Sequence, residues 1–257
     1  MNKNYSFLKF IYKFFAFRPS GNDIYLVSFP RSGNTWMRVM LAELLYGQSG
    51  KTLTDLNFFI PDIHFPPLRV IKADTHIVKS HFPFSYGLDS SKYKKVIYII
   101  RNPKDVAGSY YRYLGYHGYQ GDFSKFLEDW LAGRIWPSSW REHIVSWIGI
   151  GSDKIPVDLC LIKYEDLISD TIGQINRVVT FLGIMKDKET IIKAIETASP
   201  DNMRKKEQMR IRTREGDPGM KFIGEAKSGS WKNKLTKDQA LMIEECLSKE
   251  MKEFGYL

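Results

Sequence analysis

The strongest constraint on the fold is the alternation of short apolar runs with longer helical patterns. Runs rich in β-branched and aromatic residues, typical of buried strands, occupy residues 24–29, 76–79, 96–100 and 158–163. Helical patterns follow at residues 35–45, 103–114 and 172–182. This alternation predicts an α/β fold in which helices cover both faces of a central, mainly parallel sheet. Such sheets bind ligands at the carboxyl ends of their strands.

Length and composition favour one folded domain, which we assign to residues 21–257. The 257 residues are 43% hydrophobic and 26% charged, which excludes a disordered or low-complexity chain and suits one elaborated core. The two cysteines, Cys160 and Cys246, lie far apart, so a disulfide scaffold and a Cys-based zinc site are excluded. Their scarcity favours a reducing, cytoplasmic compartment.

Residues 1–20 are expected to form a separate, amphipathic helical segment. Aromatic and aliphatic residues recur there at near-helical spacing, and lysines interrupt the apolar run. The run is too short to span a bilayer, and no small-residue cleavage site follows it. We expect this helix to pack on the domain. Docking of residues 1–18 on a membrane surface is the alternative, and would make the protein peripheral to a membrane.

The net charge narrows the choice of partner. Lys and Arg number 38 and Asp and Glu 29, which leaves a formal charge of +9 at pH 7. Such a chain favours anionic partners, which include nucleotides, sulfated or phosphorylated compounds, nucleic acid and acidic membrane faces. Charge alone leaves all of these open.

The loop after the first predicted strand has the composition of an anion site. Residues 30–35 read PRSGNT and lead directly into a helical pattern, so backbone N–H groups and a helix N-terminus would converge on one ligand. Gly33 allows close approach of the backbone, and Arg31 adds a fixed positive charge. Asn34 stands where a nucleoside triphosphatase has its lysine, which argues against a triphosphate with magnesium. An ordinary turn with a surface arginine is the simpler alternative.

Charged residues also follow two other predicted strands. Arg101 opens the stretch RNPKD, and Ser109 lies about a turn into the following helix, so the two could grip a phosphate. His81 follows another strand within KSHFP. In a parallel sheet Arg31, His81 and Arg101 would share one rim, where an imidazole could deprotonate a hydroxyl.

A series of strings, in order along most of the chain, carries a family resemblance. They are FPRSGNTW (29–36), VKSHFP (78–83), RNPKDVAGSYY (101–111), SSWREHIVSW (138–147), YEDL (164–167) with FLG (181–183), and GSWKN (229–233). Together they resemble the sulfotransferases that use 3′-phosphoadenosine 5′-phosphosulfate (PAPS), in the branch similar to the cytosolic enzymes. The resemblance implies a P-loop nucleotide-kinase-like, three-layer fold. It also implies transfer of a sulfuryl group from PAPS to an acceptor hydroxyl, with adenosine 3′,5′-bisphosphate (PAP) as product.

The resemblance implies a role for each matched residue. His81 would be the general base, Arg31 would stabilise the bridging oxygen as the sulfuryl group leaves, and Lys79 would lie close to the sulfuryl oxygens. The implied donor-binding residues are Arg31, Ser32, Gly33, Asn34, Thr35, Trp36, Arg101, Ser109, Tyr164, Lys227 and Gly229. Among these, the loop would hold the 5′-phosphosulfate, and Arg101 with Ser109 the 3′-phosphate. No metal is implied, and the histidines show no ligand spacing.

The sequence departs from the family pattern near its C-terminal end. Relatives commonly carry Arg-Lys-Gly shortly before the last motif, where residues 224–226 of this chain read GEA, so two cations near the 3′-phosphate are missing. Lys227 or the basic run at 204–214 is the expected substitute. We expect residues 203–219 to form a polar loop or lid.

The acceptor is not specified by these motifs. Tyrosines recur every third residue from 110 to 119, and Trp136, Trp140 and Trp147 follow. Most should pack in the core, and some could line a pocket for a ring. His143 matches a position that approaches acceptors in some relatives. We expect a small-molecule or glycan hydroxyl, on a carbohydrate, lipid or phenol, and no nucleic acid partner.

Two other classes remain open. A nucleotide or small-molecule kinase would share the strand–loop–helix start, but it needs the loop lysine and a metal-holding acid. A basic adaptor for nucleic acid or acidic lipid would explain the charge of +9 and leave the His81 and Arg101 strings unexplained. The family's dimer signature is kept only at Lys232 and Thr236, so the oligomeric state is also open.

Overall fold

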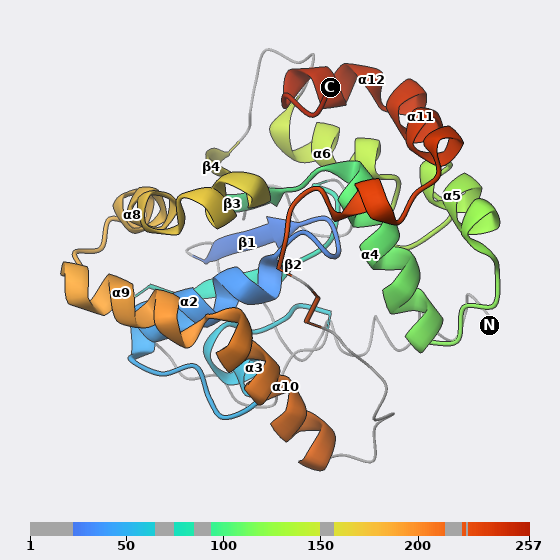
Figure 1. Ribbon diagram of the computed structural model, residues 1–257. Coiled ribbons are helices and arrows are strands. Elements are labelled where there is room, and N and C mark those ends of the chain that lie inside the picture. The colour runs from blue at the N-terminus through green and yellow to red at the C-terminus, as the bar shows by residue number, and fades with distance from the viewer. Residues whose placement is uncertain (1–22, 65–74, 85–93, 150–156, 214–222, 225) are drawn as a thin grey trace.

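A parallel sheet forms the centre of the computed structural model, which describes residues 23–64, 75–84, 94–149, 157–213, 223–224 and 226–257 (Figure 1). In this part of the chain the strands are β1 (Ile24–Ser28), β2 (Ile77–Ser80), β3 (Lys95–Ile100) and β4 (Asp158–Lys163), in the order β2-β1-β3-β4. Every pairing is parallel, as predicted. The helix expected in residues 1–20 lies outside the described residues.

Helices cover both faces of the sheet. They are α2 (Asn34–Tyr46), α3 (Leu56–Phe59), α4 (Pro103–Tyr116), α5 (Phe123–Leu131), α6 (Trp140–Ile148), α7 (Tyr164–Ser169), α8 (Thr171–Leu182), α9 (Lys188–Thr197), α10 (Pro200–Thr213), the 3-10 turn η2 (Ser230–Asn233), α11 (Lys237–Cys246) and α12 (Ser248–Glu253). One hydrophobic core lies between the sheet and α2, α8 and α9, and the other packs α5, α6, α11 and α12 (Figure 1). The predicted three-layer α/β fold is therefore confirmed.

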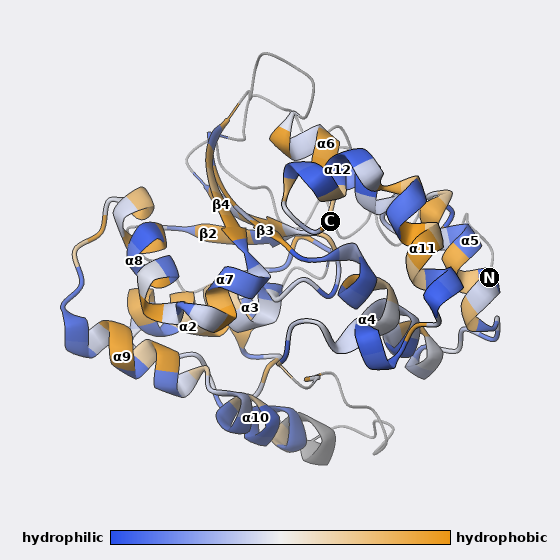
Figure 2. Ribbon diagram, turned by 45° about the horizontal axis from the view of Figure 1, so that its top comes forward, coloured by the Kyte–Doolittle hydropathy of each residue, from blue (hydrophilic) through white to orange (hydrophobic). Residues whose placement is uncertain are grey.

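Strand β1 belongs to both cores because its side chains alternate between the two faces of the sheet. Leu26 lies in the core under α2, while Tyr25 and Val27 lie in the opposite core, and all three are fully buried. Burial on both faces explains why β1 and β3 read as nearly continuous apolar runs, and much of β3 and of the middle of β4 is orange in Figure 2. Among the described helices, none has the length and apolar character needed to cross a bilayer.

The expected polar loop at residues 203–219 is wrong for its first half, because α10 continues to Thr213. Residues 214–219 lie outside the described part. Among the side chains described at residues 200–209, those of Met203 and Glu207 are buried, and Glu207 accepts the backbone N–H of Ile223. Lys, Arg, Glu and Gln are good helix formers. This helix therefore lacks the apolar stripe by which helices are read from sequence.

We predict that Leu26→Ala lowers the free energy of unfolding by about 2–5 kcal/mol, because a cavity would open in the central strand. Leu241→Ala is the matched control, since Leu241 on α11 is 52% exposed and its truncation should change stability by roughly 0.5 kcal/mol or less. Urea unfolding with a common m-value measures both. Equal losses for the two variants would contradict the assignment of Leu26 to the core.

Candidate active site

A functional candidate follows each strand of the sheet. Arg31 follows β1, His81 follows β2, Arg101 follows β3, and Tyr164 follows β4. The structure brings them together: Arg101 Nη1 donates to the Arg31 carbonyl at 2.9 Å, and the Arg101 guanidinium carbon lies 4.2 Å from the centre of the Tyr164 ring. His81 Nδ1 lies 2.6 Å from the Ser28 carbonyl, at the end of β1. The predicted common rim is therefore present.

The loop between β1 and α2 leaves a helix N-terminus without a side-chain cap. Helices α4, α5, α6, α8, α9 and α11 each have a capping side chain at the N-terminus, whereas the N-cap of α2 is Gly33, which has none. The short helices α3, α7 and α12 also lack such a cap. The first N–H groups of a helix have no intrahelical acceptor. Beside them, the Ser32 hydroxyl is buried and has no hydrogen-bond partner in the structure. Donors without acceptors are what an anion site requires.

Gly33 is required at this turn for two reasons. Its φ of 98° lies in the left-handed region that glycine tolerates. A Cβ atom there would also come within 2.6 Å of the Tyr164 ring. Trp36 lies edge-on to the same ring, with 6.0 Å between ring centroids. Tyr164 thus packs against the loop, and no larger residue at position 33 would fit.

Asn34 and Thr35, the first two residues of α2, differ in burial. The Asn34 side chain is buried, and its amide donates to the Leu26 carbonyl at 3.4 Å and to Ser28 Oγ at 3.2 Å. That side chain therefore ties the loop to β1, and only the backbone N–H of Asn34 can serve a ligand. Thr35 is half-buried on the same first turn.

Arg31 stays positively charged in the middle of the loop. Its Nε donates to Ser109 Oγ at 3.2 Å, and its guanidinium carbon lies 5.2 Å from the centre of the Tyr113 ring. Burial, followed by the positive charge of Arg112, lowers the pKa of Arg31 from 12.5 to about 10. The residue has a φ of 69°, an uncommon value for a residue with a side chain. Such backbone strain concentrates at functional sites.

The last sequence motif reaches the site through α4. The Asp105 carboxylate accepts the N–H of Gly229 at 2.7 Å, the hydroxyl of Ser230 at 3.0 Å and the N–H of Trp231 at 2.9 Å. The backbone N–H of Gly229 is therefore already bonded. The carbonyl of Lys227 accepts a hydrogen bond from Arg101 Nη2 at 3.2 Å, and the side chain of Lys227 is exposed.

Arg112 is a cation near the site that the motifs did not identify. A Cβ atom added at Gly224 would come within 3.0 Å of Arg112 Nη2, so the guanidinium lies close to the position where the sequence lacks a cation. Arg112 stands three residues after Ser109 on α4, and residues at that spacing share a helix face. The helical pattern could therefore have pointed to it. By contrast, Arg204 pairs with Asp201 on α10.

His81 is held at three points. Its backbone N–H donates to His64 Nε2 at 2.9 Å, and its carbonyl lies 3.1 Å from His143 Nε2. Because the Ser28 carbonyl can only accept, His81 Nδ1 carries the proton and Nε2 is the unprotonated nitrogen. Burial, and then the charge of Lys79, hold the pKa of His81 well below 6.5. The imidazole is therefore neutral at pH 7 and has the tautomer of a base.

His143 is a packing residue rather than a group that meets a ligand. It is fully buried, with Nδ1 2.7 Å from the Tyr98 hydroxyl. Burial lowers its pKa to about 3, so it is neutral. Trp140 and Trp147 are also buried, as expected for core aromatics. Trp136 is different, because it is 48% exposed and its ring centroid lies 6.1 Å from that of His81.

Lys79 has a buried partner that the sequence motifs did not reveal. Its ammonium lies 2.6 Å from Asp62 Oδ2, and both side chains are about nine-tenths buried. Burial acts to raise the pKa of Asp62, but Lys79 and then His64 more than offset it and leave the carboxylate ionised. In the described residues no group of three or more His, Cys, Asp or Glu side chains could hold a metal ion.

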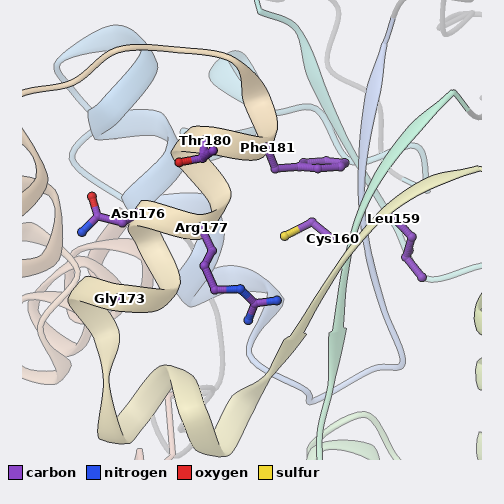
Figure 3. Close-up of a pocket in the computed structure, with 7 residues that line it drawn as sticks. All are labelled: Leu159, Cys160, Gly173, Asn176, Arg177, Thr180 and Phe181. Atoms are coloured by element: carbon purple, nitrogen blue, oxygen red, sulfur yellow. The ribbon is translucent and has the colours of Figure 1, made fainter.

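A hollow between β4 and α8 lies apart from this rim (Figure 3). Leu159 and Cys160, from the first half of β4, line it together with residues of α8. Its charged side chain, Arg177, already donates to Gln174 Oε1 at 2.7 Å and to the Leu161 carbonyl at 3.2 Å. We assign no function to this hollow.

Comparisons with known proteins agree with this arrangement. The family model for the sulfotransferase domain matches residues 21–255. Sulfotransferase 2A6 of Rattus norvegicus is 28% identical over 90% of this chain and 85% of its own length. Sulfotransferase 1 family member D1 of Rattus norvegicus is 29% identical over 93% of this chain and 86% of its own length.

Solved structures share the fold. Mouse sulfotransferase SULT7A1 complexed with PAP has a TM-score of 0.71 at 22% identity, covering 96% of this chain and 89% of that one. Retinol dehydratase in complex with androsterone and inactive cofactor PAP has a TM-score of 0.76 at 19% identity, covering 96% and 86%. With the domain match over nearly its whole length, this chain belongs to the sulfotransferase family.

Proposed function

We propose that the protein transfers a sulfuryl group from PAPS to the hydroxyl of a small-molecule acceptor. The observation that carries the proposal is the neutral His81, bonded through Nδ1 to the last residue of β1, beside the uncapped N-terminus of α2. An unprotonated imidazole next to an anion site is what hydroxyl activation beside a phosphosulfate requires. The family relatives whose structures contain PAP support the choice of donor.

The residues present fit such a donor. The 5′-phosphosulfate would lie on the N-terminus of α2, where the Ser32 hydroxyl lacks a partner and Thr35 stands on the first turn. The 3′-phosphate would meet Ser109 and Arg101, whose Nε is buried without a partner. Trp36 and Tyr164 would contact the adenosine. Lys227 would contribute its exposed side chain and Gly229 its bend in the backbone.

The chemistry follows from the charges of this chain's own groups. His81 Nε2 takes the acceptor proton as the acceptor oxygen bonds to sulfur and the bond from sulfur to the bridging oxygen breaks. The electron pair of that bond stays on the 5′-phosphate, which leaves as PAP. Arg31 stabilises the charge on the bridging oxygen because its guanidinium stays protonated. Lys79 stabilises the sulfuryl oxygens. Rate then comes from positioning and charge stabilisation.

On the acceptor side, an exposed aromatic ring stands next to the base. Trp136 lies edge-on to His64 and His81, with ring centroids 5.0 Å and 6.1 Å away. A flat apolar surface beside the proton-accepting nitrogen suits an acceptor that contains a ring. Retinol dehydratase, which shares the fold, has been solved in complexes with androsterone and with retinol, which supports a small-molecule acceptor for this chain as well.

We predict that the protein binds PAP more tightly than ATP, with no requirement for magnesium. The physical reason is that the site offers cations and helix N–H groups, whereas Asn34 replaces the lysine that a triphosphate needs. Isothermal calorimetry with PAP and with ATP plus magnesium measures the difference. A preference for magnesium–ATP would instead support a kinase. Transfer of labelled sulfate to a panel of hydroxyl acceptors then tests turnover.

We predict that His81→Ala lowers kcat by about 10²- to 10⁴-fold, the range for loss of a general base, while PAP affinity stays within twofold. In the wild-type enzyme the acid limb of kcat/KM should lie below pH 6.5, because the base loses activity only as pH falls through its lowered pKa. Sulfuryl transfer over a range of pH measures both effects. Near-normal turnover in the variant would remove His81 from the mechanism.

We predict that Arg112→Ala weakens PAP binding by about tenfold, since charge-assisted hydrogen bonds contribute about 1.5–3 kcal/mol. Adenosine 5′-monophosphate, which lacks the 3′-phosphate, should bind the variant and the wild type equally. Arg134→Ala is the control, because Arg134 is an exposed arginine paired with Asp129. Calorimetry with both nucleotides measures the contrast. A loss of affinity for both would place Arg112 elsewhere than at the 3′-phosphate.

A further inference from the structure

Residues 61–64 form a short segment that pairs with the end of β2. Lys79 donates its backbone N–H to the Pro61 carbonyl at 2.8 Å, and Ile63 donates to the Lys79 carbonyl at 3.1 Å. Asp62 thereby forms a parallel bridge with Lys79. This pairing carries the side chains of Asp62 and His64 to the two residues that would perform the chemistry on this strand.

We propose that residues 61–64 are a positioning element of the active site, in which Asp62 holds Lys79 and His64 holds His81. The inference rests on the proposed function, because it concerns residues that act through Lys79 and His81. Neither Asp62 nor His64 belongs to the motif strings that carry the family resemblance.

Asp62 uses both of its oxygens to fix Lys79 in place. Oδ2 accepts from the Lys79 ammonium at 2.6 Å, and Oδ1 accepts the backbone N–H of His64 at 2.9 Å. The second bond prevents the carboxylate from turning away from the first. Because the pair is buried, removal of one partner would leave an uncompensated charge in the interior. Lys79 therefore keeps its charge and its place through Asp62.

His64 holds the backbone of His81 rather than its ring. Its Nε2 accepts the His81 N–H at 2.9 Å, and the two imidazoles lie nearly parallel, with ring centroids 6.0 Å apart and 17° between their planes. Burial lowers the pKa of His64 to about 3, so Nε2 remains an acceptor at neutral pH. Without that acceptor, the His81 N–H would lack its partner and the imidazole would lose one of its three restraints.

The charges around Lys79 make its protonation depend on Asp62. The titratable groups that face it are Asp62, Arg38, His64 and His81. Burial lowers the pKa of Lys79, and Asp62 is the charge that opposes this, whereas Arg38 adds to it. In Asp62→Asn the pKa of Lys79 falls further. Lys79 must be protonated to stabilise the sulfuryl oxygens. In the variant it therefore loses this function as pH rises through its lowered pKa.

The first test is therefore the pH dependence of Asp62→Asn. We expect kcat to fall about 10- to 100-fold, the size of effect produced by misplacing a catalytic group, and the loss to grow with rising pH. PAP affinity should stay unchanged, because PAP has no sulfuryl group for Lys79 to meet. In Asp62→Asn with Lys79→Arg the additional loss at high pH should disappear, since a guanidinium does not titrate there. Asp201→Asn, which breaks an exposed pair on α10, is the control.

A second measurement follows the protonation of Lys79 directly and does not depend on turnover. In protein labelled with ¹³C at lysine Cε, the Lys79 resonance, assigned with Lys79→Arg, should titrate at lower pH in Asp62→Asn than in the wild type.

For His64, the comparison is His64→Gln, which keeps a hydrogen-bond acceptor, with His64→Leu, which does not. We expect His64→Leu to lose about tenfold more kcat than His64→Gln. The histidine pair tests the proposal even if Asp62→Asn fails to fold.

The outcomes separate this inference from the proposed function. A wild-type protein that neither binds PAP nor transfers sulfate would overturn the proposed function, and the Lys79 titration would still test the control by Asp62. The positioning role alone would be overturned by a different result. The wild-type enzyme would transfer sulfate, Asp62→Asn would keep full kcat over the whole pH range, and His64→Gln and His64→Leu would have the same kcat.

Discussion

Parallel pairing of β1 with a neighbour on each side is the constraint on which the site depends. Ile24 pairs with Ile77 on β2 and with Lys95 on β3, so the strands run level and end together. Adjacent strands lie about 4.8 Å apart, and the residues just beyond their ends are therefore neighbours. This places the Arg101 guanidinium on the Arg31 carbonyl and the His81 ring on the Ser28 carbonyl at the end of β1, although these residues lie far apart in sequence. Arg31, His81 and Arg101 stand outside the strands, whereas Lys79 lies within β2 and is buried with Asp62 as its partner.

Much of the fold could be predicted because β1 and β3 are buried on both faces and β4 has an apolar centre. Such strands read as short apolar runs, and the expected strands at 96–100 and 158–163 match β3 and β4 within one residue. Helix α10 could not be predicted in the same way. Its stability comes from helix-forming polar residues and from contacts at Met203 and Glu207, which leave no apolar stripe in the sequence. Sequence patterns indicate burial, and within residues 200–209 of this helix only Met203 and Glu207 are buried.

From the residues alone, the site could be predicted best where a residue follows a strand. Arg31, Arg101 and His81 do so, and a parallel sheet puts them on one rim. Asp62 could not be predicted, because it reaches Lys79 through a bridge between a loop and β2 that only the folded chain forms. Asn34 shows the reverse case. Its place in the loop suggested contact with a ligand, but the first turn of α2 directs its side chain to β1.

Burial among cations acts differently on the two groups that the chemistry needs. Arg31 begins with a pKa of 12.5 and falls to about 10, which leaves the guanidinium charged at neutral pH. The pKa of His81 has an ordinary value of 6.5, and burial together with the charge of Lys79 moves this pKa well below that value, which leaves the imidazole neutral. Burial beside cations thus leaves Arg31 charged and His81 neutral, which are the states that the proposed function needs. The separation between the ordinary pKa values of arginine and histidine makes this possible, even though the nearby Asp62 carboxylate acts to raise the pKa of His81.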